Sequence, residues 1–204
     1  MSLFSYENLI DPILKNVRRI TPEFSGMKVG DRVLDVCCGT GAQVFEYGQR
    51  GIPAIGIDKE PNMLCIALKN RKKQNSENTS FNLADATNLP FCDNKFDYVS
   101  VSFGLHDKER EIRNKIVSEM KRVVKKEGSL VLIDYRVPLP GNIWAVFIRT
   151  IEFIVGGSHY RGFKDYMNSG GLTNILDRHC LVREKVDYFK NGTVVIVKAR
   201  IHSE

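Results

Sequence analysis

The sequence predicts an α/β protein with a doubly wound, mostly parallel β-sheet that closes with an antiparallel hairpin. Short apolar runs rich in β-branched residues alternate five times with helix-compatible segments, which is typical of parallel strands with helices on both faces. Near the C-terminal end, two strand-like runs are joined by Lys190-Asn191-Gly192. Because Asn-Gly between such runs signals a hairpin, we expect the last two strands to be antiparallel.

The first half of the chain is expected to contribute four strands. Apolar residues at helical spacing predict an amphipathic helix over residues 5–20, followed by a connector over Thr21–Asp31. Further helices are predicted over Ala42–Gln49 and from Pro61 to Lys73, because proline suits a first helical turn. The predicted strands are Arg32–Cys37, Ala54–Ile57, Ser80–Ala84 and Phe96–Ser102.

The second half is expected to begin with a long helix over Glu109–Lys126, whose apolar residues share one face and which Gly128 ends. The apolar segment Asn142–Val155 is too short to span a bilayer. We expect it to be a core helix, with an acceptor-pocket wall, a membrane-surface contact or a dimer seam as alternatives. The remaining strands are predicted over Ser129–Asp134, Leu181–Tyr188 and Thr193–Arg200.

The composition indicates one ordinary globular domain. A chain of 204 residues is long enough for one hydrophobic core and too short for two. With 43% hydrophobic and 26% charged residues, a single domain over residues 1–204 is predicted. Five cysteines, mostly in apolar runs, indicate reduced thiols and a cytoplasmic protein. The adjacent Cys37 and Cys38 lack a Cys-x-x-Cys partner, so no metal site is predicted.

The charge pattern leaves two interpretations open. Much of the net charge of +6 lies in two clusters, residues 69–73 and 121–126, at the ends of predicted helices. Solvated helix ends are the favoured interpretation, and an anionic partner such as a lipid surface or nucleic acid is the alternative. The chain shows no secretory leader pattern and no run of 18 apolar residues.

The candidate site begins with a strand–turn–helix segment that contains Gly39 and Gly41. These glycines let the backbone turn tightly and approach a ligand, as in nucleotide sites at the carboxyl end of a parallel strand. Asp35 lies in the first strand, while Asp58 and Asp85 follow the second and third strands. Asp58, 19 residues after Gly39, suits ribose hydroxyls, and Asp85 suits the exocyclic amine of adenine.

The loop and the acids together favour a cofactor without phosphates. Val44 stands where dinucleotide-binding loops need a third small residue, which disfavours nicotinamide and flavin cofactors. Three carboxylates at neighbouring strand ends, with no lysine or arginine in the loop, suit a positively charged sulfonium cofactor better than a pyrophosphate.

Five motifs carry a family resemblance that extends from Tyr6 to Lys198. The motifs are Val33–Gly41, Ile55–Asp58, Ala84–Phe91, Phe96–His106 and Glu119–Gly128. In these motifs the chain resembles the class I S-adenosylmethionine-dependent methyltransferases. It is most similar to the small-molecule branch that includes the ubiquinone/menaquinone-biosynthesis methyltransferases. The resemblance implies a Rossmann-like, seven-stranded fold and S-adenosyl-L-methionine as cofactor.

The resemblance also implies roles for single residues. The backbone of Gly39 and Gly41 would face the methionine part of the cofactor, and Asp35 would hold its ammonium group, directly or through water. Asp58, with Lys59 beside it, would bind the ribose. Turn or N-cap carboxylates and a core phenylalanine are the structural alternatives. The other implied cofactor-binding residues are Asp85 and Ala86 at the adenine, Phe103 at the adenine or the methyl-transfer site, Cys37 and Ser102.

Methyl transfer chiefly needs alignment of the reacting groups, so a general base is optional. His106, with Asp107 beside it, is the catalytic candidate, and a solvent-facing loop histidine is the alternative. His159 and Tyr160 are candidates for the acceptor pocket. The Pro-Pro-aromatic element of nucleic-acid amino-methyltransferases is absent after the fourth strand. We therefore expect a small-molecule or lipid-like acceptor, quinone-type included, and not nucleic acid.

The domain is expected to carry two helical additions. Residues 1–28 would form a cap that shields the cofactor from water, and about 138–178 a helical insertion on the acceptor side. Peripheral membrane contact and a homodimer are the partner interactions considered. Two other function classes stay open at this point: a non-catalytic partner subunit that keeps cofactor binding, and a nicotinamide-dependent oxidoreductase.

Overall fold

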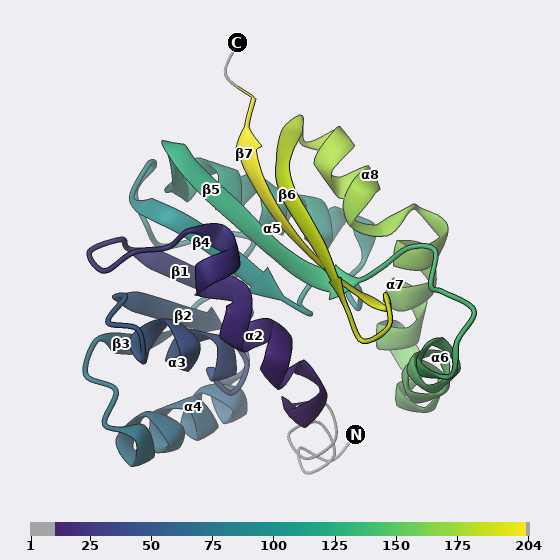
Figure 1. Ribbon diagram of the computed structural model, residues 1–204, viewed down its shortest axis with the longest axis horizontal. Helices are drawn as coiled ribbons and strands as arrows, with labels where there is room; N and C mark the ends of the chain where they lie inside the picture. The colour runs from purple at the N-terminus through teal and green to yellow at the C-terminus, as the bar shows by residue number, and fades with distance from the viewer. Residues whose placement is uncertain (1–10, 203–204) are drawn as a thin grey trace.

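In the computed structural model, which describes residues 11–202, the strands form one seven-stranded sheet in the order β3-β2-β1-β4-β5-β7-β6 (Figure 1). The strands are β1 Val33–Val36, β2 Ala54–Asp58, β3 Thr79–Leu83, β4 Phe96–Ser102, β5 Val124–Tyr135, β6 Leu181–Phe189 and β7 Val194–Ile201. The helices are α2 Asp11–Ser25, α3 Ala42–Gly48, α4 Pro61–Gln74, α5 Arg110–Val123, α6 Ile143–Val155, α7 Gly157–Asn168 and α8 Gly171–Arg178.

The predicted fold class is confirmed, including the closing hairpin. Strands β1 to β5 pair in parallel, whereas β7 pairs antiparallel with both β5 and β6. In the hairpin turn, Lys190, Asn191 and Gly192 all have positive φ, and the Gly192 N–H donates to the Phe189 carbonyl at 3.0 Å. Asparagine and glycine tolerate this left-handed backbone, which is why the dipeptide marks the turn.

The N-terminal helix α2 continues further than predicted. It runs through Pro22, which the sequence placed in a connector. Proline has no N–H to donate to the carbonyl four residues earlier. The side-chain amide of Gln43 in α3 donates to that carbonyl, Arg18 O, at 3.3 Å. The helix therefore passes Pro22 because a neighbouring helix supplies the missing donor. Residues 5–10 of the predicted helix lie outside the described residues.

The prediction for the end of α5 was wrong by three residues, because strand pairing starts at Val124 and not after Gly128. Val124 is fully buried and pairs with Phe96 at the start of β4. A register shift follows, and Gly128 lies in that irregular stretch. The long helix is thus ended by a β-branched residue that joins the sheet, and the glycine allows the bulge that follows.

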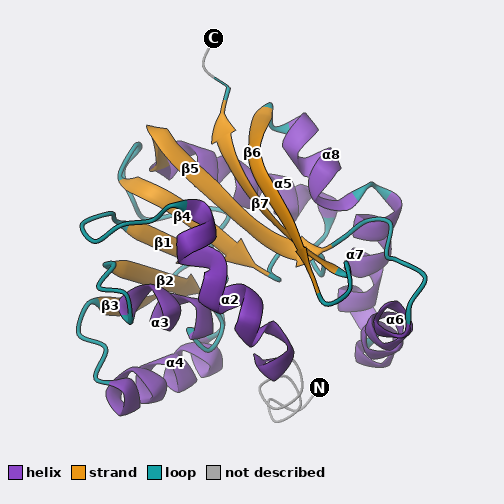
Figure 2. Ribbon diagram, in the orientation of Figure 1, coloured by secondary structure: helices purple, strands orange, loops and turns teal. Residues whose placement is uncertain are grey.

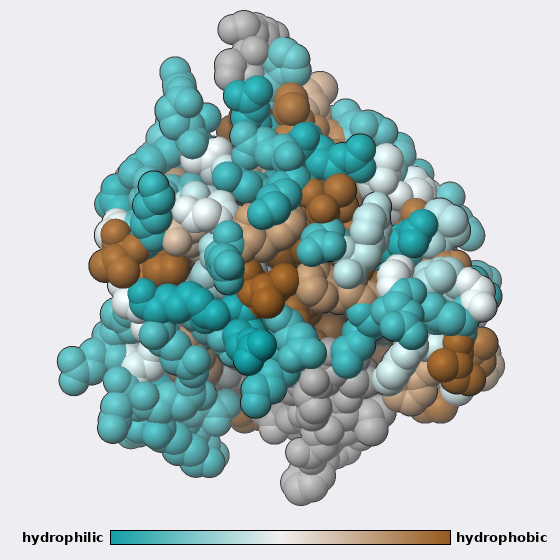
Figure 3. Space-filling view, viewed as in Figure 1, coloured by the Kyte–Doolittle hydropathy of each residue, from teal (hydrophilic) through white to brown (hydrophobic). Residues whose placement is uncertain are grey.

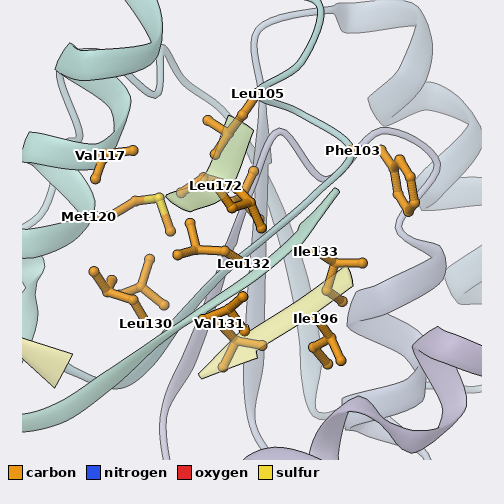
Figure 4. Close-up of a cluster of buried hydrophobic side chains, with 14 of the residues drawn as sticks. Phe103, Leu105, Val117, Met120, Leu130, Val131, Leu132, Ile133, Leu172 and Ile196 are labelled. Atoms are coloured by element: carbon orange, nitrogen blue, oxygen red, sulfur yellow. The ribbon is translucent and has the colours of Figure 1, made fainter. Parts of the chain in front are cut away.

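Helices cover both faces of the sheet, with α2 and α3 in front and α5 behind in Figure 2. Alternate residues of β5 serve the two layers, as strand geometry requires. Figure 4 shows Leu130 and Leu132 on the side of Met120 from α5, and Val131 and Ile133 on the opposite side. All of these side chains are buried. This two-sided core fixes the ends of the central strands, where the site lies.

Helices α6, α7 and α8 form a group beside the sheet, at the right in Figure 1. The Asn142 side chain caps α6 by accepting the Ala145 N–H at 3.0 Å. Ala145, Ile148 and Glu152 are buried, so one face of α6 belongs to the core as predicted. The other face exposes apolar side chains: Ile143, Val146, Phe147, Phe153 and Ile154. Figure 3 shows a hydrophobic patch at the lower right, where α6 lies. Among the described helices, none has the length and apolar character needed to cross a membrane.

Candidate functional site

The carboxyl ends of β1 to β4 border a cavity of about 560 Å³, a size typical of small-molecule sites. Arg18 of α2 and His159 of α7 also line it, so the N-terminal helix and the inserted helices both reach the site. Most residues predicted to bind the cofactor are in its wall: Cys37, Gly39, Asp58, Lys59, Asp85, Ala86, Ser102 and Phe103. Asp35, Gly41 and His106 lie behind that wall.

Asp58 is bound to the glycine turn by hydrogen bonds. The Gly39 N–H donates to Oδ2 of Asp58 at 2.8 Å, and the Glu60 N–H donates to Oδ1 at 3.0 Å. Gly39 has a φ of 54°, and a Cβ there would meet no atom within 4 Å. The turn therefore presents bare backbone to the cavity, directly beside the carboxylate at the end of β2.

Gly41 positions the turn from behind. It caps α3 with a φ of 80°, and a Cβ at this position would lie 2.6 Å from Cζ of Phe81. Glycine is needed here both for the left-handed backbone and for close packing against β3. Its role is thus to hold the turn that Gly39 exposes.

Asp85 lines the cavity at the end of β3, as predicted, and it also stabilises the turn that follows. The N–H and the hydroxyl of Thr87 both donate to its Oδ1 at 2.8 Å. These hydrogen bonds lower the pKa of the Asp85 carboxyl, which keeps it anionic at neutral pH. Ala86 beside it is buried and lines the same cavity. The site therefore offers a fixed anionic acceptor at the end of β3.

Asp35 lies beneath the turn and is only 1% exposed. Its Oδ1 accepts a hydrogen bond of 2.5 Å from the Ser100 hydroxyl. Burial raises the pKa of the Asp35 carboxyl to about 7, although Ser100 and the positive charge of Arg18 act in the opposite direction. Of the two predicted forms of its contact with an ammonium group, this position favours the indirect one, through water.

Three residues at the ends of β1 and β4 shape the middle of the cavity. Cys37 and Phe103 have left-handed backbones, with φ of 55° and 54°, a strain of about 1–3 kcal/mol per residue that gathers at ligand sites. Burial raises the pKa of the Cys37 thiol to about 12, so the thiol stays neutral. The buried hydroxyl of Ser102 has no hydrogen-bond partner within the described part of the chain.

His106 lies in a buried ionic cluster. Its Nδ1 is 2.7 Å from Oδ1 of Asp134, and its Nε2 is 3.6 Å from Oε1 of Glu152. Burial lowers the pKa of the imidazole, but the two carboxylates outweigh this and raise the pKa to about 9. Because both ring nitrogens of His106 face buried carboxylates and the residue does not line the cavity, the geometry does not favour its predicted role as general base.

Titratable groups at the cavity wall come instead from His159 and Asp107. His159 Nδ1 is 3.5 Å from Asp107 Oδ2, and its Nε2 is 2.7 Å from Glu152 Oε2. The Lys108 ammonium lies 2.6 Å from the same Asp107 oxygen. The sequence named His159 as a pocket candidate and Asp107 as the neighbour of His106, but it assigned no site role to Lys108 or Arg18. The N-terminal cap and the segment after β4 were both expected near the cofactor, but which of their charged side chains reach the cavity depends on the fold.

Residues 27–152, more than half of the chain, match the family described as a methyltransferase domain. The chain belongs to the methyltransferase domain family. The resemblance expected from the motifs is thus confirmed, and with it S-adenosylmethionine as the cofactor of this domain. Membership of this family also removes the ground for the nicotinamide-dependent alternative.

The methyltransferase domain has relatives named demethylmenaquinone methyltransferase. It is 35% identical over 134 residues to that of Paenarthrobacter aurescens, covering 64% of this chain and 50% of the relative. It is 32% identical over 156 residues to that of Listeria welshimeri, covering 73% of this chain and 65% of the relative. The matched part thus spans between half and two thirds of the length of these relatives.

Solved structures confirm the fold. A putative methyltransferase from Bacillus halodurans has a TM-score of 0.71 and 18% identity, with 92% of this chain and 100% of that chain covered. A SAM-dependent methyltransferase from Aquifex aeolicus has a TM-score of 0.68 and 22% identity, with 97% and 93% covered. At these identities the likeness concerns the seven-stranded fold alone.

The residues of the cavity fit S-adenosylmethionine in their chemistry. Asp58 and Asp85 supply carboxylate oxygens, the groups that accept hydrogen bonds from ribose hydroxyls and an adenine amine. The open backbone at Gly39 admits a ligand without side-chain hindrance. The hydroxyl of Ser102, which has no partner among the described residues, is a polar group that a bound ligand could satisfy. The site thus combines the donors and acceptors that this cofactor requires.

Proposed function

We propose that this domain transfers the methyl group of S-adenosylmethionine, in line, to a small, apolar, quinone-type acceptor. The observation that carries the proposal is a single cavity with two kinds of wall. One part contains Gly39, Asp58 and Asp85, which suit the cofactor. Another contains the aromatic ring of Phe103 and the imidazole of His159, which suit an aromatic acceptor with oxygen substituents.

The named relatives support the quinone class of acceptor. Both relatives described above carry the name demethylmenaquinone methyltransferase. Because the aligned parts cover 64% and 73% of this chain, the acceptor side of the cavity is argued from this chain's own residues. The helical insertion over about 138–178 supplies His159 to the cavity, which supports its proposed acceptor-side role. We likewise assign the cap role to α2, because its Arg18 reaches the cavity.

Each wall residue has a defined task under this proposal. Bound cofactor supplies a methyl group activated by a positively charged sulfur. Gly39 and Asp58 hold the ligand against the end of β1, and Asp85 fixes its adenine end. Phe103 limits where an acceptor can lie. Its backbone has a positive φ, and its ring packs edge-to-face against Tyr135, with 5.3 Å between the ring centroids. Alignment of this kind is the main contribution that methyl transfer needs.

The exposed face of α6 extends the proposal to a lipid surface. Phe153 and Ile154 are 67% and 70% exposed, and the exposed cation Arg149 lies on the same helix. Exposed apolar side chains with a cation nearby are features that favour contact with the interface of anionic membranes. A quinone-type acceptor would be reached from such a surface. A cytoplasmic location remains part of the proposal and agrees with five free thiols among the described residues.

The function is tested by measuring S-adenosylhomocysteine release with a panel of acceptors: a demethylated naphthoquinol, a benzoquinol, a catechol and an RNA oligonucleotide. The proposal predicts turnover with a quinol and none with RNA. Asp58→Asn should lower turnover strongly, whereas Asp177→Asn, an exposed carboxylate on α8, should leave it unchanged. Cofactor binding without turnover on any acceptor would favour the non-catalytic partner subunit instead.

A further inference from the structure

Three side chains from separate elements converge beside the cavity: His106 after β4, Glu152 of α6 and His159 of α7. One ligand atom from each lies within 4.8 Å of the others. Glu152 is the central member, since Oε1 is 3.6 Å from His106 Nε2 and Oε2 is 2.7 Å from His159 Nε2. A tetrahedral metal ion with bonds of about 2.0–2.1 Å places its ligand atoms about 3.3 Å apart. The two separations from the Glu152 carboxylate to the histidine nitrogens lie on either side of that value, and all three ligand atoms are within 4.8 Å of one another.

The surroundings orient these groups as the outer shell of a metal site does. Asp134 accepts from His106 Nδ1 at 2.7 Å, which leaves Nε2 directed at Glu152. The Tyr135 hydroxyl donates to Oε1 of Glu152 at 3.1 Å. A carboxylate behind a histidine and a hydrogen bond to the ligand carboxylate are the usual supports of a metal ligand set. Asp134 itself is held by the N–H groups of His106 and Tyr135 at 3.1 and 2.8 Å.

The two buried carboxylates of the cluster need positive charge close to them. Asp134 and Glu152 are both buried, and their ion pairs are with the two histidines. Burying two carboxylates is costly unless positive charge accompanies them. Two protonated imidazoles or one divalent cation with neutral imidazoles would meet that need. Both Nε2 atoms face the Glu152 carboxylate, and this arrangement suits the cation.

We propose that His106, Glu152 and His159 form a site for a divalent transition-metal ion such as Zn²⁺. Two imidazoles and one carboxylate are the ligand set of catalytic zinc and of non-haem iron sites, which keep open positions for substrate. Of the three ligands His159 lines the cavity, as does the neighbouring Asp107, so the site borders the cavity. Resting on the proposed function, the ion binds an oxygen of the acceptor and favours its ionised form. Metal binding itself does not depend on that function.

The site is tested with Co²⁺, which reports its ligands by visible absorption, and with Zn²⁺ by calorimetry, both without cofactor. One ion per chain should bind, without the thiolate charge-transfer band that binding to exposed cysteines would give. His159→Gln and Glu152→Gln should each weaken binding by at least about tenfold, and the outer-shell variant Asp134→Asn by about 10- to 100-fold. The exposed histidine variant His202→Gln should bind as the unmodified protein does.

Three outcomes would overturn the site: no saturable binding, a thiolate band, or equal affinity in His159→Gln and His202→Gln. His159 is partly exposed, with a side-chain exposure of 27%, so His159→Gln keeps the test valid even if a buried variant fails to fold. The role at the acceptor is tested separately by chelation. Turnover that is unchanged after complete removal of a bound ion would refute that role while leaving the site intact.

Discussion

The Gly39 N–H and the Asp58 carboxylate are joined by a hydrogen bond of 2.8 Å, which connects the turn after β1 to the end of β2. Both residues line the same cavity. One carboxylate therefore has two tasks, since it holds the turn and offers oxygens to a ligand. Substitution of the half-buried Asp58 is expected to affect the cofactor site more than substitution of an exposed acid away from the cavity.

Asp58→Ala should weaken the binding of S-adenosylmethionine by about 10- to 100-fold, because a hydrogen bond to a charged group is worth about 1.5–3 kcal/mol. Isothermal calorimetry measures this directly. Asp177→Asn, in α8 and away from the cavity, is the control and should bind as the unmodified chain does. An unchanged dissociation constant in Asp58→Ala would show that the ribose assignment is wrong.

Gly41→Ala should lower the free energy of unfolding by about 2–4 kcal/mol, from backbone strain together with overpacking. The physical reason is a φ of 80° combined with a Cβ position 2.6 Å from the Phe81 ring. Gly26→Ala is the matched control, since Gly26 has a φ of 75° and open space around it. Chemical denaturation should show a loss of only about 1–2 kcal/mol for the control. Equal losses would mean that packing against Phe81 contributes nothing.

Asp35 should make the stability depend on pH between about 4 and 7. Its folded pKa of about 7 lies above the ordinary value of 3.8. The folded chain therefore keeps a proton that the unfolded chain releases, and this contribution to stability is lost as pH rises through that window. In Asp35→Asn this pH-dependent loss of stability should be absent. The difference in the free energy of unfolding between the variant and the unmodified chain should therefore shift in favour of the variant as pH increases. Denaturation curves with the same pH slope for both proteins would contradict the burial of this carboxyl.

The apolar face of α6 should bind vesicles that contain anionic phospholipid. Replacing Phe153 and Ile154 together by serine should reduce the fraction that sediments with vesicles, because both side chains are largely exposed. Val29→Ser removes an apolar side chain that is 76% exposed elsewhere and should have no effect. If the serine variant instead converts a dimer to a monomer in size-exclusion chromatography, the face is a dimer seam.

The sequence predicted the sheet and its hairpin because apolar runs, glycines and Asn191-Gly192 act locally. The predicted helix bounds were wrong where a contact with a residue distant in the sequence determines the local structure. α2 passes Pro22 because Gln43 supplies a donor, and α5 ends because Val124 pairs with Phe96. Neither partner can be found from the local pattern. Tertiary contacts override local signals in both places.

In the candidate site, too, some features could be predicted from local sequence and others depend on tertiary contacts. Asp58, Asp85 and the turn at Gly39 follow strands directly, so their position at the sheet edge could be predicted from order alone. His106 has the expected place in the chain, but its pairing with Asp134 and Glu152 arises from β5 and α6 packing around it. A histidine's protonation state depends on such partners, so the sequence alone could propose His106 as a base but could not predict the groups that surround it.

The most direct test of the central claim is to incubate the protein with S-adenosylmethionine that carries a deuterated methyl group and with a demethylated naphthoquinol. The mass of the acceptor is then measured. Methyl transfer predicts that the acceptor gains one deuterated methyl group for each S-adenosylhomocysteine formed, and that Asp58→Ala forms far less of the product. An acceptor of unchanged mass, in the presence of bound cofactor, would contradict the proposed activity on this class of acceptor.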